Sequence, residues 1–232
     1  MAATPPIVSP YSLPILPGPF VGPQGGVSRA VEKQICCGRG GWRLDCGPMK
    51  ATDGIRLTAP IKEKTARSLR AGDSVLICGV VYTARDMAHL RMCQALEAGQ
   101  ALPFDLEGAV IYFVGPTPAR PGRVIGAAGP TTSSRMDAFS PRLIAAGLKA
   151  TIGKGYRNEQ VQKALKEYGA VHLSTIGGAG ALLSRHIVGA ELIAYEDLGT
   201  EAIRRLTVVD FPAIVAYDSY GQSIYARAGS CE

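Results

Sequence analysis

The sequence has few aromatic residues and no dense run of basic ones. Aromatic residues make up 6% of the 232-residue chain, and its 25 Lys and Arg residues are scattered along it. Nucleic-acid-binding surfaces usually stack bases on aromatic rings and follow phosphates with clustered basic side chains. Nucleic-acid binding is therefore not expected, and the net charge of +6 suits a small anionic substrate or an acidic partner subunit.

The six cysteines contain no C-x-x-C pair. They lie at positions 36, 37, 46, 78, 93 and 231. Zinc modules and ferredoxin-type clusters need closely spaced thiolates that converge on one centre. The first three cysteines can in principle hold a metal, but a structural role for them is favoured, and no metal site is expected in this chain.

Long apolar runs and the common phosphate-binding motifs are also missing. No apolar run of 18 residues exists, and the sequence does not open with a basic segment followed by an apolar one. Neither a membrane span nor a secretion signal is expected, and a cytoplasmic location is the default. Residues 147–154 do not have the spacing of a Walker A loop, and the glycines of 177–180 do not make G-x-G-x-x-G.

The first fifty residues differ in composition from the rest. Proline and glycine punctuate "MAATPPIVSPYSLPILPGPFVGPQGG" so often that neither a helix nor a sheet can propagate. Residues 1–50 are predicted to be a disordered tail, or a tail that lies on a partner, and Met49 is an alternative start of the protein. Residues 51–232 are predicted to form the folded domain.

Buried strands alternate with amphipathic helices in the folded part. Strands are predicted over residues 74–84 and 108–115, in "KATIGKGYR", in "VHLSTI", and as two separate strands near "LTVVDF" and "AIVAYD". The alternation predicts an α/β fold in which helices cover a mixed sheet.

Three helices are predicted from their terminal residues. Thr83 stands three residues before Asp86, like a capping box, at the start of a helix that runs to position 99. Ser140 is predicted to cap a second helix whose first turn holds a proline. Asn158 is predicted to cap a third, which Gly169 ends.

Four polar, glycine-containing turns follow predicted strands directly. They are "YTARD", "GPTTSSRMD", "GKGYR" and "STIGGAGA". Ligands of α/β sheets bind at the carboxyl ends of the strands, where helix N-termini present free N–H groups. If the four turns share one edge, Arg85, Arg135, Lys154 and Arg157 converge there and can bind a substrate with two carboxylates. Taken singly, each of these cations fits an ordinary surface role.

Three further residues are candidate supporting groups. His89 lies four residues after Arg85 and would share its helix face, so it either lines the site or is a structural histidine bonded to the backbone. Asp86 and Asp137 each follow a candidate arginine closely and are expected either to orient that arginine or to cap a helix.

Six motifs in a fixed order resemble one family. "VVYTARDMAH", "GPTTSSRMD", "GKGYR", "STIGGAGALL", "YEDLGTEAI" and "VVDFPAIVAYDSYG" occur between position 57 and about position 225. Together they resemble the β subunit of class I, iron–sulfur fumarate hydratases and of L(+)-tartrate dehydratases, equivalent to the C-terminal domain of the single-chain forms. The resemblance implies a swivelling β/β/α domain and a hydro-lyase reaction of the tricarboxylic acid cycle, the reversible hydration of fumarate to L-malate.

The resemblance also implies a partner and site residues. A [4Fe–4S] cluster is held by the α subunit in this family, so the chain is expected to be inactive alone and to act in a heterodimer or heterotetramer. Arg85 and Arg135 resemble the clamps for the substrate carboxylates and Lys154 a third cationic contact that also serves catalysis. Thr131 resembles a threonine that takes part in moving the C3 proton. Ser134 and Tyr156 depart from the residues that this family usually has.

Two other functions remain open. The same clamp would bind L-tartrate or another hydroxy-diacid, because it recognises carboxylates and not the extra hydroxyl. The chain can also be a non-catalytic assembly module that keeps the fold. The joint presence of Thr131, Arg85, Arg135 and Lys154 argues against the assembly module.

Overall fold

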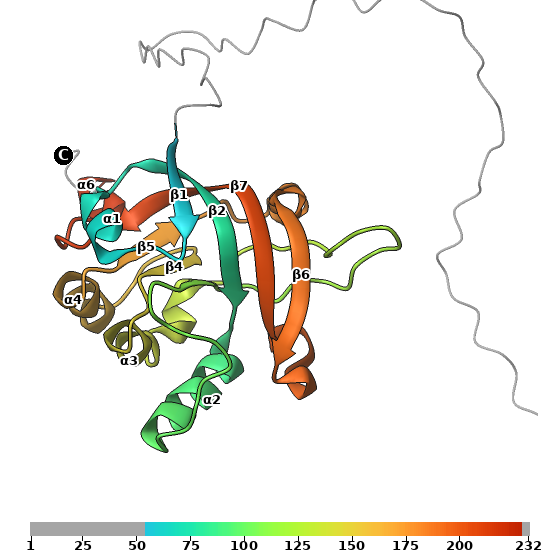
Figure 1. Ribbon diagram of the computed structural model, residues 1–232. Helices are drawn as coiled ribbons and strands as arrows, with labels where there is room; N and C mark the ends of the chain where they lie inside the picture. The colour runs from blue at the N-terminus through green and yellow to red at the C-terminus, as the bar shows by residue number, and fades with distance from the viewer. Residues whose placement is uncertain (1–53, 229–232) are drawn as a thin grey trace, which may run out of the picture. The chain divides into compact units, whose positions relative to one another are not determined.

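The computed structural model describes residues 54–228, which contain one seven-stranded mixed sheet. The strands follow the order β1-β2-β3-β4-β5-β7-β6 (Figure 1). Their bounds are β1 Ile55–Ala59, β2 Ser74–Thr83, β3 Val110–Tyr112, β4 Ala150–Gly153, β5 Val171–Ser174, β6 Ile187–Ala194 and β7 Ile203–Tyr217. The predicted tail, residues 1–50, and the cysteines at 36, 37, 46 and 231 lie outside the described residues.

The long strand β7 closes part of the sheet into a ring. Strands β1 to β5 pair in parallel, whereas β7 runs antiparallel to both β2 and β5. Ile214 of β7 is in register with Ser74 of β2 and with Ser174 of β5. Strands β2, β3, β4, β5 and β7 therefore form a closed ring, and β1 and β6 extend it.

Helices cover the sheet on the outside. They are α1 Glu63–Ser68, α2 Asp86–Glu97, α3 Ser140–Ala145, α4 Glu159–Glu167, α5 Gly180–Leu183 and α6 Ile224–Ala228, with the 3₁₀ helices η1 Ser133–Met136, η2 Ser184–His186 and η3 Glu196–Glu201. One apolar core, which includes Ile77, Tyr112 and Phe211, is built largely from strand residues. A second core, which includes Met92, Leu143 and Leu165, packs α2, α3 and α4 against the sheet (Figure 1). The helices of the described part are all too short or too polar to cross a membrane.

The mixed α/β fold with covering helices is confirmed, but the prediction of two strands near the C-terminus was wrong. Both segments belong to the single 15-residue strand β7. Asp210, with a φ of 48°, lies where the pairing with β2 shifts register next to Cys78, and the Asp210 N–H donates to Cys78 Sγ at 3.3 Å. The strand therefore continues through the Asp-Phe-Pro sequence, with a local irregularity in its pairing at Asp210, and does not end there.

Two of the three predicted caps are also wrong. Thr83 is the last residue of β2; its hydroxyl donates to the Ala202 carbonyl at 3.1 Å and accepts from the Arg204 N–H at 2.9 Å, so it ties β2 to the start of β7. Ser140 is the first residue of α3, and its hydroxyl donates to the Met136 carbonyl. Asn158 caps α4 as predicted, since its side chain accepts from the Val161 N–H at 2.9 Å.

Candidate substrate-binding site

The four polar turns do share one edge of the sheet. Each follows the carboxyl end of a parallel strand: Arg85 comes after β2, Thr131 follows the loop after β3, Lys154 comes after β4 and Gly177 after β5. These four strands are neighbours in the sheet. The condition that the four turns share one edge is therefore met, because parallel neighbours carry their carboxyl ends to the same edge.

Direct contacts join the turns to one another. Arg135 of η1 forms an ion pair with Asp86, the first residue of α2. Thr132 bridges to Lys154 as in a parallel ladder, and the Ser133 N–H donates to the Lys154 carbonyl at 2.9 Å. Lys154 also reaches the next turn, since a Cβ added to Gly177 would lie 3.6 Å from its Nζ. The edge is thus one connected surface.

Arg85 is held in a narrow slot. Its guanidinium lies 3.3 Å from a carboxylate oxygen of Glu201, at the end of η3. The other oxygen of Glu201 accepts from the Met87 N–H at 3.2 Å, at the start of α2. A Cβ added to Gly115 would come within 2.8 Å of Arg85 Nη1 and 3.3 Å of the Thr200 carbonyl, so a larger residue at 115 would displace the guanidinium from this position.

Several polar atoms at this edge have no partner within residues 54–228. Arg85 Nε and Asp86 Oδ1 are buried and make no hydrogen bond there. The side-chain ammonium of Lys154 and the hydroxyl of Thr131 make none with this part of the chain either; the Thr131 N–H is fixed by the Phe113 carbonyl at 2.7 Å. Buried polar atoms are nearly always satisfied, so Arg85 Nε and Asp86 Oδ1 point to a polar ligand or water, whereas the half-buried Thr131 and Lys154 side chains are accessible to one.

Arg157, predicted to converge with the other cations, lies in the core instead. It is 3% exposed, and its Nε donates to Asp137 at 2.6 Å. Its Nη2 donates to the Ser140 hydroxyl at 2.6 Å. Asp137 therefore does not orient Arg135; it neutralises Arg157, and its second oxygen accepts from the Asn158 N–H at 2.8 Å. Glycine at 155 turns the chain between Lys154 and this buried arginine.

A buried histidine connects this core to the turn above it. His172 of β5 is fully buried, and Arg157 Nη1 lies 3.3 Å from its Nδ1. Its Nδ1 also lies 2.8 Å from the Thr151 hydroxyl, and its Nε2 lies 3.2 Å from the Ser133 hydroxyl. Burial, together with the charge of Arg157, holds the pKa of His172 well below its usual value. A neutral imidazole thus supports the turn that carries Thr131 and Arg135.

His89 supports Arg85 from behind. It is fully buried in α2, and its Nδ1–H donates to the Arg85 carbonyl at 2.9 Å. Burial lowers the pKa of His89 to about 4, so the ring is neutral at physiological pH. Of the two roles considered for His89, the structure shows the histidine that is bonded to the backbone. Its buried Nε2 has no hydrogen-bond partner in the described part of the chain.

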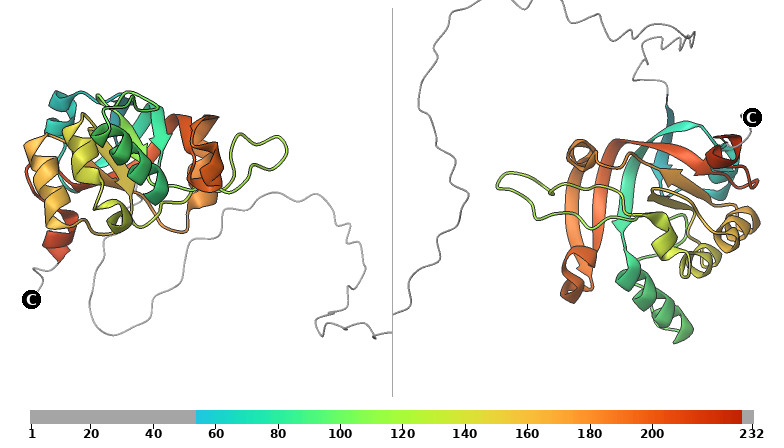
Figure 2. Two further views of the ribbon diagram at one scale, coloured as in Figure 1. Left: turned by 90° about the horizontal axis from the view of Figure 1, so that it is seen from below. Right: turned by 180° about the vertical axis from the view of Figure 1, so that it is seen from behind.

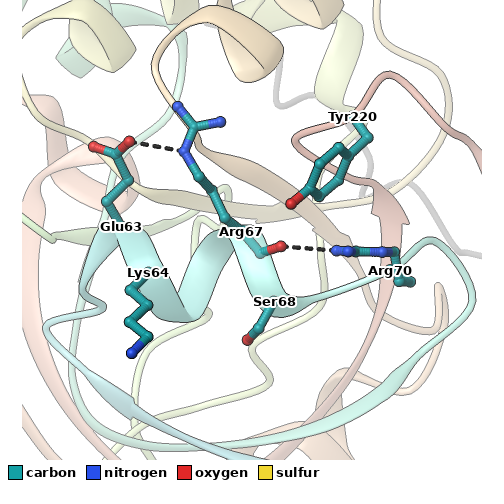
Figure 3. Close-up of a pocket in the computed structure, with 6 residues that line it drawn as sticks. All are labelled: Glu63, Lys64, Arg67, Ser68, Arg70 and Tyr220. Carbon is teal, nitrogen blue, oxygen red and sulfur yellow. Dashed lines mark hydrogen bonds and ion pairs between the residues drawn. The ribbon is translucent and has the colours of Figure 1, made fainter.

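The candidate residues line neither of the two cavities that the structure shows most clearly. Figure 3 shows the first, about 550 Å³, beside α1. In it Arg67 turns to Glu63 and Arg70 lies over the ring of Tyr220. The second lies beside the loop after β3. The candidate substrate-binding edge thus lies apart from both of these cavities.

The described thiols do not form a cluster-binding set. Cys78 pairs with Asp210, and Cys93 is buried with its Sγ 3.8 Å from the Phe139 carbonyl. Within residues 54–228, no three His, Cys, Asp or Glu side chains gather as a metal site would need. An iron–sulfur cluster does not fit this part of the chain.

Two functional candidates escaped prediction. Glu201 lies in the "YEDLGTEAI" motif, which was one of the six in the resemblance, but a carboxylate more than a hundred residues after Arg85 gives no local sign of pairing with it. His172 lies in a strand whose apolar pattern predicts only burial. The motif was the one available signal for Glu201, and His172 had none.

Comparisons with known proteins assign the chain to a family. A family model described as "Fumarase C-terminus" matches residues 43–228. The chain is similar to the "Putative L(+)-tartrate dehydratase subunit beta" of Methanocaldococcus jannaschii, with 37% identity over 171 residues, 71% of this chain and 88% of that protein.

Longer proteins match over the same region. The aerobic class I fumarate hydratase of Escherichia coli strain K12 is 34% identical over 177 residues, which are 75% of this chain and 32% of that protein. Fumarate hydratase 2 of Leishmania major is 34% identical over 158 residues, 67% of this chain and 28% of that protein. The chain spans only about a third of these fumarate hydratases. It belongs to the fumarase C-terminus family and corresponds in extent to the β subunit in it.

Proposed function

We propose that this chain is the β subunit of an iron–sulfur-dependent hydro-lyase that reversibly hydrates fumarate to L-malate. The observation that carries the proposal is the single edge that gathers Arg85, Arg135, Lys154 and Thr131 from three neighbouring turns. The family assignment adds relatives named for this reaction.

The two arginines act as a clamp for the substrate carboxylates. Arg85 and Arg135 each contact one protein carboxylate, Glu201 and Asp86. A guanidinium has five N–H donors, so each arginine keeps donors for a substrate oxygen after that contact. Glu201 and Asp86 fix the directions in which those donors point. A dicarboxylate bound between them is held at both ends, which orients its double bond.

Lys154 and Thr131 lie nearest the proposed chemistry. The hydroxyl of threonine is a poor base, because its pKa is far above neutral. The ammonium of Lys154, on the adjoining turn, would favour an alkoxide at Thr131 by charge and would also neutralise part of the substrate. In this account Thr131 takes or relays the C3 proton.

The chain needs a partner for the remaining chemistry. The chain matches about a third of the length of the longer fumarate hydratases, and we assign the chemistry of the remaining part to a partner chain. We assign the [4Fe–4S] cluster, which supplies a Lewis acid for the hydroxyl group, to a cognate α subunit. The assembly is a heterodimer or heterotetramer in the cytoplasm.

The experiment is anaerobic co-expression of the chain with its cognate α subunit, followed by cluster reconstitution. The purified complex should convert fumarate to L-malate and remove water from L-malate. A complex that forms and carries its cluster but turns over no dicarboxylate would overturn the proposed function.

L(+)-tartrate is the second candidate substrate. One relative named as a tartrate dehydratase subunit is matched over 88% of its length, a much larger share than any fumarate hydratase cited above. The clamp binds both diacids, so kcat/KM for L-malate and for L-tartrate must be compared on the same complex. A higher value for tartrate would make this chain a tartrate dehydratase subunit and leave the clamp roles unchanged.

A further inference from the structure

A basic groove lies next to the candidate substrate-binding edge. The loop between β3 and η1 projects beyond β6 (Figures 1 and 2). Between this loop and the α5–η2 segment the structure has a cavity of about 440 Å³. Its lining includes Arg120, Arg123 and Arg185, together with Val124, Ile125 and Ile187. We call this cavity the loop groove.

The loop groove carries positive charge that the described chain does not neutralise. Its lining contains three arginines and no Asp or Glu. None of the three guanidinium groups makes a hydrogen bond or ion pair within residues 54–228. Most other arginines of this part do: Arg91, for example, pairs with Asp197 and Arg142 with Glu97. Three arginines that line one groove without carboxylate partners fit a negatively charged binding partner.

The loop is anchored at its base, although its tip projects. Thr117 pairs with Ala127 twice: its N–H donates to the Ala127 carbonyl at 3.1 Å, and its hydroxyl accepts from the Ala127 N–H at 2.9 Å. A Cβ at Gly126 would lie 2.2 Å from the Thr117 carbonyl oxygen, so the two arms pack backbone against backbone. The groove is therefore a built feature with a fixed base.

The anchored base continues directly into the substrate-binding turns. The Ala128 N–H donates to the Gly180 carbonyl at 3.0 Å, and a Cβ at Gly180 would meet the Gly129 nitrogen at 2.8 Å. Gly129 opens the turn that carries Thr131. Gly180 lies at the end of the turn that follows β5, and Gly177 of the same turn lies beside the Lys154 side chain. A partner seated in the loop groove would thus lie next to the turn that carries Thr131.

We propose that the loop groove docks an acidic segment of the α subunit that completes this site. The inference rests on the proposed function for the identity of the partner. Charge complementarity gives the chemistry of the segment, and the exposed Val124, half accessible to solvent, offers an apolar contact beside the arginines. The base of the groove contacts the turn after β5, and its loop continues into the turn that carries Thr131.

The test is the dissociation constant between the separately purified full chain and the cognate α subunit, measured anaerobically at low and high salt. The double variant Arg120→Glu with Arg123→Glu should raise Kd at least about tenfold at low salt and remove most of its salt dependence. The matched control, Lys64→Glu with Lys163→Glu on α1 and α4, changes the net charge equally and should bind like the wild type. Circular dichroism and melting temperature should show that both variants fold.

Unchanged binding of the loop variant would overturn the proposal, and so would equal weakening by the control. A loop variant that changes only self-association in sedimentation would assign the groove to a second copy of this chain and also overturn it. Failure of the wild-type chain to bind the α subunit would likewise overturn the proposal. The readout is binding, so a complex that assembles through the groove yet hydrates no fumarate would reject the proposed function alone.

Discussion

Asp86 forms its ion pair with Arg135, 49 residues away, and not with its neighbour Arg85. Arg85 turns to Glu201 instead. Each candidate arginine is thus oriented by a carboxylate from a different part of the chain. The crossed pairing fixes α2, η1 and η3 together at one edge, which explains how two guanidinium groups of like charge can lie on neighbouring turns.

Replacing Arg135 by Met should leave the fold intact and weaken catalysis. Arg135 is nearly half exposed, so the fold loses only a surface ion pair. In the assembled enzyme kcat/KM should fall by at least about 30-fold, because a charged hydrogen-bond pair with the substrate contributes about 2 kcal/mol. Arg142→Met, which removes another exposed arginine from its carboxylate partner Glu97, is the control and should have no effect. An unchanged kcat/KM would remove Arg135 from the site.

Replacing Glu201 by Gln should raise KM for the dicarboxylate more than it lowers kcat. The amide can still accept from the Met87 N–H but no longer holds the Arg85 guanidinium by charge. Steady-state kinetics of the assembled enzyme should show KM raised about tenfold. The control is Asp197→Asn, which removes another carboxylate of η3 from its arginine partner, Arg91 of α2. It shows how much of the effect comes from a structural change in η3 alone. Equal changes in the two variants would refute an orienting role for Glu201.

Replacing Asp137 by Asn should destabilise the fold strongly. The variant leaves Arg157, which is 3% exposed, without its counter-charge in the core. Breaking a buried ion pair costs about 3–5 kcal/mol, whereas an exposed pair contributes about 0–1 kcal/mol. Urea unfolding of the full chain should show the larger loss for Asp137→Asn and the smaller one for Glu97→Gln. A loss below about 1 kcal/mol for Asp137→Asn would contradict the account of Arg157.

Stability should fall with acid because of His89. Its pKa is about 4 in the folded chain, against 6.5 when unfolded. As pH falls below 6.5 the unfolded state takes up the proton first, so the free energy of unfolding drops by about 3 kcal/mol between pH 6.5 and 4. Well above pH 6.5 the histidine is neutral in both states, and its contribution to the free energy of unfolding no longer changes with pH. His172 acts in the same direction.

The variant His89→Asn isolates this effect. An asparagine amide can donate to the Arg85 carbonyl as Nδ1–H does, but it does not titrate. Unfolding free energies at pH 7 and pH 4.5 should therefore differ less in His89→Asn than in the wild type. Equal pH dependence in the two proteins would contradict a neutral, buried His89.

The convergence of the four turns could be predicted from the sequence, because buried strands followed by polar turns repeat a local pattern. The crossed ion pairs could not. Arg135 and Arg157 both follow a glycine- or hydroxyl-rich turn, and only the path of the backbone after Lys154 sends Arg157 into the core. Similarly, nothing local shows that β7 continues past Asp210, since its partners β2 and β5 are distant in the sequence.

The most direct test of the central claim is a reconstitution titration. Increasing amounts of this chain are added anaerobically to a fixed amount of cluster-loaded α subunit, and fumarate hydration is followed. The account predicts no activity from either chain alone, a rise that saturates at a fixed ratio of chains, and almost no rise with Arg135→Met. Full activity of either chain by itself, or an equal rise with Arg135→Met, would contradict it.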